Sequence, residues 1–456
     1  MSVVKEEKMG TAPIGRLMVS MAVPSIIAQI INILYSIVDR IYIGHIEGVG
    51  AAALTGVGLT FPIITLISAF SAFAGTGGAP LASIWLGKGD RERAEKILGN
   101  AVCMLIGFSV ILMVVFYLFQ RPFLYMFGAS DVTIGYAMDY LSVYLAGTLF
   151  VELALGLNPF LISQGRSREA MMSIVIGAVI NIVLDPIFIF VFHWGVRGAA
   201  VATVISQAVS AAWNVKCLLD KKATLKIVPS GIRPDWAVMG RIGSLGVSPF
   251  IMRSTESLIS IVLNRGLQMY GGDLYVGSLT IMQSVMQLFS APLAGFTQGV
   301  QPIISYNFGA GKFDRVRKTY RGMIGVSFLI SFVCTLTAML FPALYAGMFT
   351  NDGELIALVG QVMPVFMCGM LIFGLQNGIQ PTFLALGQAK ISLFIALLRK
   401  VILLVPLALI LPNFFGVMGI YFAEPIADII SAVTASVLFL CNIKKILSRE
   451  VLERVG

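Results

Sequence analysis

Long apolar segments separated by short polar ones dominate this chain. A helix needs about 20 residues to cross a bilayer, and twelve segments reach that length. Apolar runs of this kind predict helices, because a helix satisfies its own backbone hydrogen bonds where water is absent. The segments are residues 16–44, 50–85, 97–119, 133–160, 169–192, 197–218, 240–270, 274–306, 322–344, 354–384, 391–411 and 416–442.

The composition agrees with a membrane protein. Of 456 residues, 57% are hydrophobic and 12% are charged, whereas a water-soluble protein carries roughly 25% charged residues. The sequence therefore predicts an all-α integral membrane protein with twelve transmembrane helices.

Several proline, serine and glycine residues of the first half recur about 222 residues later in the chain, which indicates an internal repeat. The matching pairs are Pro80 and Pro302, Ser83 and Ser305, Gly87 and Gly309, Gly89 and Gly311, and Pro159 and Pro381. We expect an N-terminal six-helix lobe over residues 1–219, a cytoplasmic linker over 220–236 and a C-terminal six-helix lobe over 237–456. Because an even number of helices precedes the linker, the repeat is parallel and its pseudo-two-fold axis follows the membrane normal.

Lysine and arginine lie in alternate polar segments. With a cytoplasmic N-terminus, the inner segments hold 25 of the 32 basic residues. These are Lys5, Lys8 and Arg16, residues 88–96, Arg166 and Arg168, residues 216–241, 312–321, Lys390 and 444–454. This positive-inside bias predicts that both termini are cytoplasmic in a multi-pass protein of the plasma membrane.

Several function classes lack support. The net charge of +9 follows the membrane topology, so it does not indicate nucleic acid. No phosphate-binding loop is present, since Gly311 and Lys312 are followed by Phe313, and we expect no direct use of ATP. The five cysteines are scattered and predict neither a disulfide framework nor a metal site.

The ionisable residues inside the apolar segments of the first half are acidic: Asp39, Glu152 and Asp185. Each carries an insertion penalty of about 2.5–3.5 kcal/mol, which marks it as functional. Asn181 lies four residues before Asp185, so both side chains share a helix face. Pro186 should interrupt the helical hydrogen bonds at this point.

A helix rises by about 1.5 Å per residue, so the depth of a residue in the membrane follows from its distance to the helix end. By this measure Asp39, Asp185 and Thr203 each lie roughly 10 Å inside the outer boundary, and we expect them to meet. Two adjacent carboxylates in a low dielectric cannot both ionise at low cost, so we expect them to take up a proton near neutral pH. With Asn181 they would equally suit a sodium ion. In the structural alternative, Asp39 caps its helix beside Arg40 and Asp185 hydrogen-bonds within its bundle.

The interior of the second half mixes charges of both signs. The residues are Arg253 and Glu256, Arg399 and Lys400, and Glu424 and Asp428. Three cations and three anions fit a structural ion-pair network. In the functional alternative, Glu256, Arg399, Glu424 and Asp428 form a second cation or substrate site, in which Glu256 and Asp428 face a cavity that receives cations.

Several motifs in order resemble the multidrug and toxic compound extrusion (MATE) family, above all its prokaryotic branch. They are VINIVLDPIFIF followed by GVRGAAVATVIS, then QGVQPIISYNFGAG, ALLRKVILLVPL and EPIADIIS. The resemblance covers nearly the whole chain. It implies two six-helix lobes forming a V that exports organic cations in exchange for protons or sodium ions. It also places an N-lobe cation site on Asp39, Asn181, Asp185 and Thr203, and a second coupling residue on Glu256.

From these features we expect a multidrug antiporter that exports small cationic, amphipathic molecules by alternating access. We expect it to be a monomer surrounded by membrane lipid, with no cofactor beyond the coupling ion. Such a transporter confers antibiotic resistance. We expect no enzymatic activity. Two alternatives stay open: a flippase for lipid-linked precursors from the same superfamily, which usually has added helices and a cationic cavity, and an intramembrane prenyltransferase, which needs a second aspartate-rich stretch.

Overall fold

The computed structural model describes residues 9–221 and 223–454. The helices of the first half are α2 (Ile14–Gly44), α3 (Gly50–Gly58), α4 (Phe61–Gly87), α5 (Arg91–Met126), α6 (Ile134–Ala146), α7 (Thr148–Ser163), α8 (Ser167–Pro186) with the π-helix η1 (Ile187–Val191), and α9 (Gly195–Leu219). The linker contains the short helix η2 (Pro229–Gly231).

The helices of the second half are α10 (Trp236–Gly271), α11 (Asp273–Gly309), α12 (Phe313–Leu340), α13 (Pro342–Gly347), α14 (Gly353–Met367), α15 (Met370–Ala385), α16 (Ala389–Leu397) with the π-helix η3 (Leu398–Leu404), α17 (Val405–Ile410), α18 (Pro412–Phe415), α19 (Val417–Ile446) and α20 (Arg449–Arg454). No strand occurs in the described part of the chain.

These helices form the twelve membrane-crossing units that the sequence predicts. Eight described segments are long and apolar enough to span, and the bent pairs α6–α7 and α14–α15 raise the number to ten. The remaining two are α9 and α10, of 25 and 36 residues. Their mean hydropathy is lowered by polar residues, such as Arg253 and Glu256 in α10.

The bends recur at equivalent positions in the two halves. The break between α6 and α7 is at Gly147, and α14 and α15 are separated by Cys368 and Gly369. The chain turns by 61° at the first break and by 45° at the second. A Cβ on Gly147 would lie 2.5 Å from Val204, and one on Gly369 would lie 2.6 Å from Pro425. Glycine at both bends therefore lets a neighbouring helix pack into the break.

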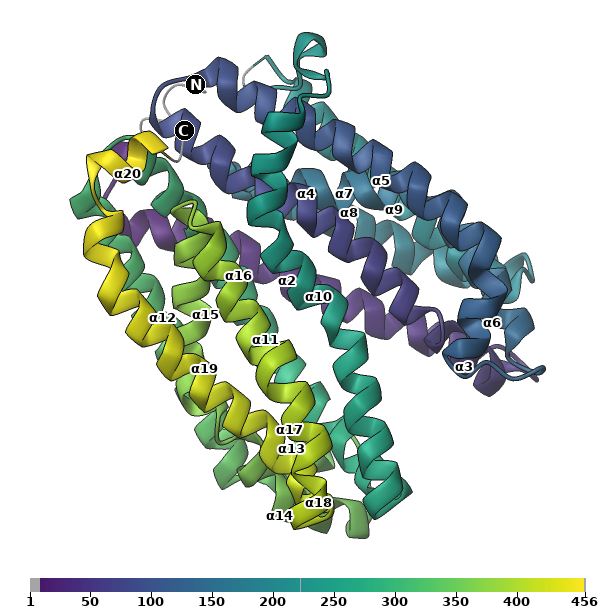
Figure 1. The fold of residues 1–456 in the computed structure, drawn as a ribbon. Coiled ribbons are helices and arrows are strands. Elements are labelled where there is room, and N and C mark those ends of the chain that lie inside the picture. Colours follow the sequence, from purple (N-terminus) through teal and green to yellow (C-terminus); the bar gives the residue numbers. More distant parts are fainter. Residues whose placement is uncertain (1–8, 222, 455–456) are drawn as a thin grey trace.

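The two halves form two lobes (Figure 1). The lobes meet at the end that carries the linker, and they separate toward α3 in one lobe and α18 in the other. Three hydrophobic clusters follow this shape. One includes Leu81 of α4 and Ile304 of α11, and it joins both lobes at the closed end. The other two each belong to one lobe, around Leu141 and around Met363.

The linker packs against the start of α5 at the closed end. Lys96 pairs with Asp235 at 2.5 Å, and this hydrogen bond lowers the pKa of that carboxyl group. Gly99 admits the backbone of Gly231, which lies 2.2 Å from the position of a Cβ. Figure 1 shows the linker and α20 at the same end of the molecule. Lys5 and Lys8, counted in the predicted charge bias, lie outside the described residues.

Candidate functional site

The structure brings Asp39, Asn181, Asp185 and Thr203 together inside the N-lobe. Asn181 Nδ2 donates to Asp185 Oδ1 at 3.3 Å and to Thr203 Oγ1 at 3.4 Å. The carboxyl group of Asp39, from α2, lies next to that of Asp185. Asn181 and Asp185 are fully buried. Helices α2, α8 and α9 thus converge on one group of oxygen atoms.

Three of these oxygen atoms have no hydrogen-bond partner among the described residues: Asp39 Oδ1, Asn181 Oδ1 and Asp185 Oδ2. Two carboxylate groups side by side both accept hydrogen bonds, so they stay close only when a proton or a cation lies between them. A buried polar atom without a partner also carries a desolvation penalty. This group of oxygen atoms can therefore accept a proton or a cation.

The local helix geometry shapes this site. Pro186 has no backbone N–H, and directly after it the helix widens into the π-helical turn of η1. The carboxyl group of Asp185 therefore sits where the regular ladder ends. The sequence predicts a disruption at Pro186 but not its π-helical form.

The structural alternative for the pair fits the structure only in part: Asp185 does accept a hydrogen bond within its own helix, from Asn181, but Asp39 is not a capping residue. Helix α2 continues to Gly44, so Asp39 lies inside the helix and caps neither end. The guanidinium of Arg40 lies 4.5 Å from the centroid of the Phe61 ring, and it makes no ion pair with any described residue. Asp39 consequently lies beside Asp185 without an ion pair to a described basic residue.

Tyrosines contribute to the same region, and the sequence analysis missed them. Tyr140 of α6 is buried, stacks on Tyr144 with ring centroids 6.2 Å apart, and lies next to Asp39 and Thr203. Tyr35 lies one helical turn before Asp39. A spacing of four residues places Tyr140 and Tyr144 on one helix face. That spacing was the available signal, but in an apolar segment it equally indicates simple packing.

The C-lobe holds its charges in two groups. Arg399 Nε donates to Asp428 Oδ1 at 2.6 Å, and its Nη2 donates to Glu424 Oε1 at 2.9 Å. Its guanidinium also lies 4.2 Å from the centroid of the Phe373 ring. Lys400 Nζ lies 2.5 Å from Glu256 Oε2. These contacts join α10, η3 and α19.

Glu256 and Asp428, the two anions that we expected to face a cavity for cations, lie differently with respect to that cavity. A cavity of about 380 Å³ lies in the C-lobe, and Glu256, Arg399, Lys400 and Glu424 line it. Asp428 is fully buried behind Arg399 and does not line this cavity. The side chain of Glu256 is 65% exposed, against 6% for Lys400. Glu256 is thus the anion that a ligand can reach.

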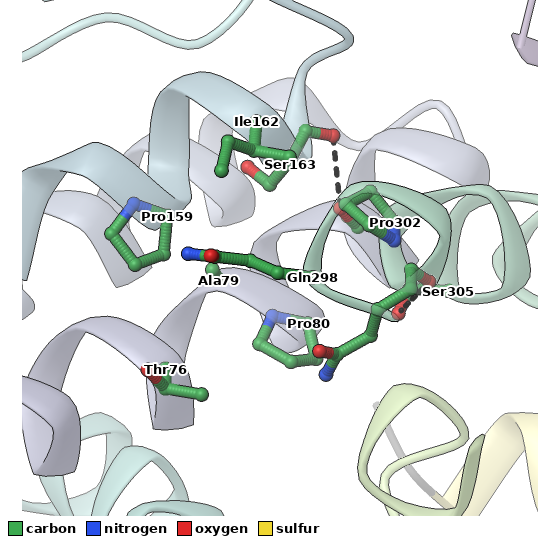
Figure 2. A pocket seen from close by; sticks show the side chains of 11 residues that line it. Thr76, Ala79, Pro80, Pro159, Ile162, Ser163, Gln298, Pro302 and Ser305 are labelled. Carbon is green, nitrogen blue, oxygen red and sulfur yellow. Dashed lines mark hydrogen bonds between the residues drawn. The ribbon is translucent and has the colours of Figure 1, made fainter. Parts of the chain in front are cut away.

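A small pocket marks the contact between the lobes. It has a volume of about 30 Å³ and is lined by equivalent residues of the two repeats, including Pro80 with Pro302 and Ser83 with Ser305. Figure 2 shows the side chain of Gln298 reaching into it. Gln298 also accepts a hydrogen bond from Gln29 of α2 at 3.0 Å. The pseudo-two-fold axis therefore passes close to this pocket.

A family model described as MatE matches this chain twice, at residues 24–187 and again at residues 250–410. The chain belongs to the MatE family. The two matches fall one in each lobe, which agrees with a duplicated six-helix unit. The predicted membership of the MATE family is confirmed.

Relatives and solved structures agree with this assignment. The multidrug export protein MepA of Staphylococcus haemolyticus is 26% identical, and the match covers 92% of each chain. A crystal structure of MATE in the bent conformation is 24% identical, with a TM-score of 0.88 over 99% of this chain and 98% of that one. An outward-facing MATE family transporter is 22% identical, with a TM-score of 0.89 over 96% and 98%. The predicted MATE fold, with two six-helix lobes, is thereby confirmed.

Proposed function

We propose that this protein is an antiporter that exports small cationic, amphipathic compounds across the plasma membrane in exchange for protons or sodium ions. The observation that carries the proposal is the pair of Asp39 and Asp185, which lie close together with an unpartnered oxygen each and no ion pair to a described basic residue; Asp185 is fully buried and Asp39 is half-buried. A transporter with such a site can couple ion entry to the movement of its lobes, provided that the ion binds one conformation more tightly than the other.

The neutral oxygens of Asn181 and Thr203 widen the choice of coupling ion. A sodium ion prefers oxygen ligands, and the group offers carboxyl, amide and hydroxyl oxygens from three helices. A proton needs only the two carboxyl groups. The same geometry thus suits either ion.

The shape of the molecule supports export by alternating access. The lobes separate at the end away from the linker and α20. With the orientation that the positive-inside bias predicts, this open end faces outward. The N-lobe pair lies toward that side, where an incoming ion arrives. Binding there would favour release of the exported compound and closure of the outer end.

The named relatives support a multidrug transporter rather than an enzyme, because MepA is described as a multidrug export protein. The cavity of the C-lobe tells against a flippase for anionic lipid-linked precursors. Its cations Arg399 and Lys400 are each paired with carboxylates, so they do not offer a free cationic surface. We propose that the protein acts as a monomer on small molecules, without ATP and without a resident cofactor.

The test is ethidium transport by the purified protein in liposomes, with a proton gradient and a sodium gradient imposed separately. We expect at least one gradient to drive ethidium against its concentration difference. Transport driven by neither gradient, with the protein correctly folded, would overturn the proposal. Asp139→Asn, which removes an exposed ion pair with Arg197, is the matched control for the aspartate variants.

A further inference from the structure

The ion pair between Lys400 and Glu256 differs from the other charge contacts of the C-lobe. Both members line the cavity, but the side chain of Glu256 is 65% exposed whereas that of Lys400 is 6% exposed. The Nζ and Oε2 atoms are 2.5 Å apart. A ligand in the cavity can therefore contact Glu256 while Lys400 stays within the protein.

The other charged groups around this pair have their own contacts or lie apart. Arg399 precedes Lys400 in η3 and binds both Glu424 and Asp428 of α19. Arg253, three residues before Glu256 on α10, makes no ion pair with a described residue. Within the described chain, Glu256 is thus the carboxylate that Lys400 contacts.

We propose that an organic cation with an apolar body binds in the C-lobe cavity by replacing Lys400 as the counter-ion of Glu256, and that Lys400 then releases its proton. The inference deepens the proposed function and rests on it. In the exchange, the Lys400 ammonium becomes a neutral amine, the proton passes to water in the cavity, and the incoming cation pairs with the Glu256 carboxylate. One positive charge enters and one leaves.

The physical reason is the cost of an unpaired buried charge. Once a cation occupies Glu256, an ammonium that is almost wholly enclosed would lose its partner, and this is strongly unfavourable. A lysine can escape the penalty by giving up its proton, whereas an arginine cannot. The position next to the cavity thus requires lysine for exchange, while the neighbouring Arg399 keeps a permanent charge within its network.

The remaining walls of the cavity suit the apolar body of such a ligand. Met252, Met286, Met370, Phe366 and Phe373 line it together with Gln283 and Gln287. Methionine side chains are polarizable and adapt to different shapes, and the aromatic face of phenylalanine attracts a cation. The amide groups are neutral, so Glu256 supplies the charge recognition.

The test measures proton release when tetraphenylphosphonium, a permanent cation without a titrating proton, binds to the purified protein in weak buffer. The protein carries Asp39→Asn and Asp185→Asn, so that the N-lobe pair contributes no proton. We expect about one proton released per cation bound, and an affinity that rises about tenfold per pH unit while Lys400 is protonated in the free protein. Binding without proton release would overturn the inference, yet it would leave the coupling role of the N-lobe pair untouched.

Variants at Lys400 make the assignment specific. Lys400→Met should bind tetraphenylphosphonium without proton release and with an affinity that does not change with pH. Lys400→Arg keeps the ion pair but cannot release a proton, so it should bind the cation much more weakly. Lys390→Met, outside the cavity at the start of α16, is the control and should release protons as the parent does. Persisting proton release in Lys400→Met would refute the role of Lys400, and thermal unfolding of each variant verifies that it is folded.

Discussion

Gly87 and Gly309 occupy equivalent positions in the two repeats, and each packs against the backbone of the helix that carries the other. A Cβ on Gly87 would lie 2.0 Å from the carbonyl oxygen of Tyr306, and one on Gly309 would lie 1.9 Å from that of Ile84. Ile84 and Tyr306 are themselves equivalent positions. The crossing of α4 and α11 is therefore one contact repeated by the pseudo-two-fold axis, and it holds the lobes together at the closed end.

Replacing either glycine should separate the lobes at this crossing. We expect Gly87→Ala and Gly309→Ala each to destabilise the protein by about 1–3 kcal/mol, because the methyl group meets rigid backbone. Export should fall in parallel, since the closed end would no longer form. Two quantities are measured for each variant: the midpoint of thermal unfolding and the rate of ethidium export. Gly107→Ala in α5, where no atom lies within 4 Å of the added Cβ, is the control. Equal stability of Gly309→Ala and this control would contradict the interpretation.

The acidic pair of the N-lobe gives the second prediction. Asp39→Asn and Asp185→Asn should each reduce gradient-driven ethidium export to background while leaving ethidium binding largely intact. Each change removes the group that takes up the ion but keeps the side-chain volume. Export is measured at matched protein amounts against Asp139→Asn. Export at the unmutated rate in either variant would remove that aspartate from the coupling mechanism and leave Glu256 as the main candidate.

Depth explains why this pair could be predicted from the sequence. A transmembrane helix rises by a fixed distance per residue, so the height of Asp39 and Asp185 follows from their distance to the helix ends. The length of the apolar runs likewise predicted the twelve membrane-crossing segments, and the repeated Pro80 and Pro302 predicted the two lobes. These features depend on the chain alone.

Rotation of each helix about its own axis could not be predicted in the same way. The sequence gives no means to tell that Asp428 turns toward Arg399 while Glu256 faces the cavity, because this depends on which helices pack together. The π-helical turns beside Asp185 and around Arg399 are also set by packing. For the same reason Tyr140 could not be separated from the many aromatic residues that only fill space.

The Arg399 network gives the third prediction. Removing one partner of a buried ion pair leaves an uncompensated charge, so Arg399→Met should destabilise the protein by about 3–5 kcal/mol. Adding Glu424→Gln and Asp428→Asn to that variant should restore much of the loss, because the unpaired carboxylates disappear with their partner. Thermal unfolding of the purified variants measures both effects. No recovery in the triple variant would show that the loss comes from packing against Phe373 rather than from charge.

Thr203 gives the fourth prediction, because loss of its hydroxyl group should affect sodium coupling and proton coupling differently. Thr203 accepts a hydrogen bond from Asn181 and places a neutral oxygen beside the acidic pair. Thr203→Val keeps the side-chain shape and removes that oxygen. A sodium ion would lose a ligand, whereas a proton would still find both carboxyl groups. We expect sodium-driven ethidium export to fall at least tenfold more than proton-driven export, which corresponds to about 1.4 kcal/mol of differential binding. The measurement uses the same liposomes with each gradient in turn, and Ser36→Ala, an exposed hydroxyl on α2 that bonds its own helix, is the control. Equal losses under both gradients would mean that Thr203 supports the fold of the site rather than ion binding.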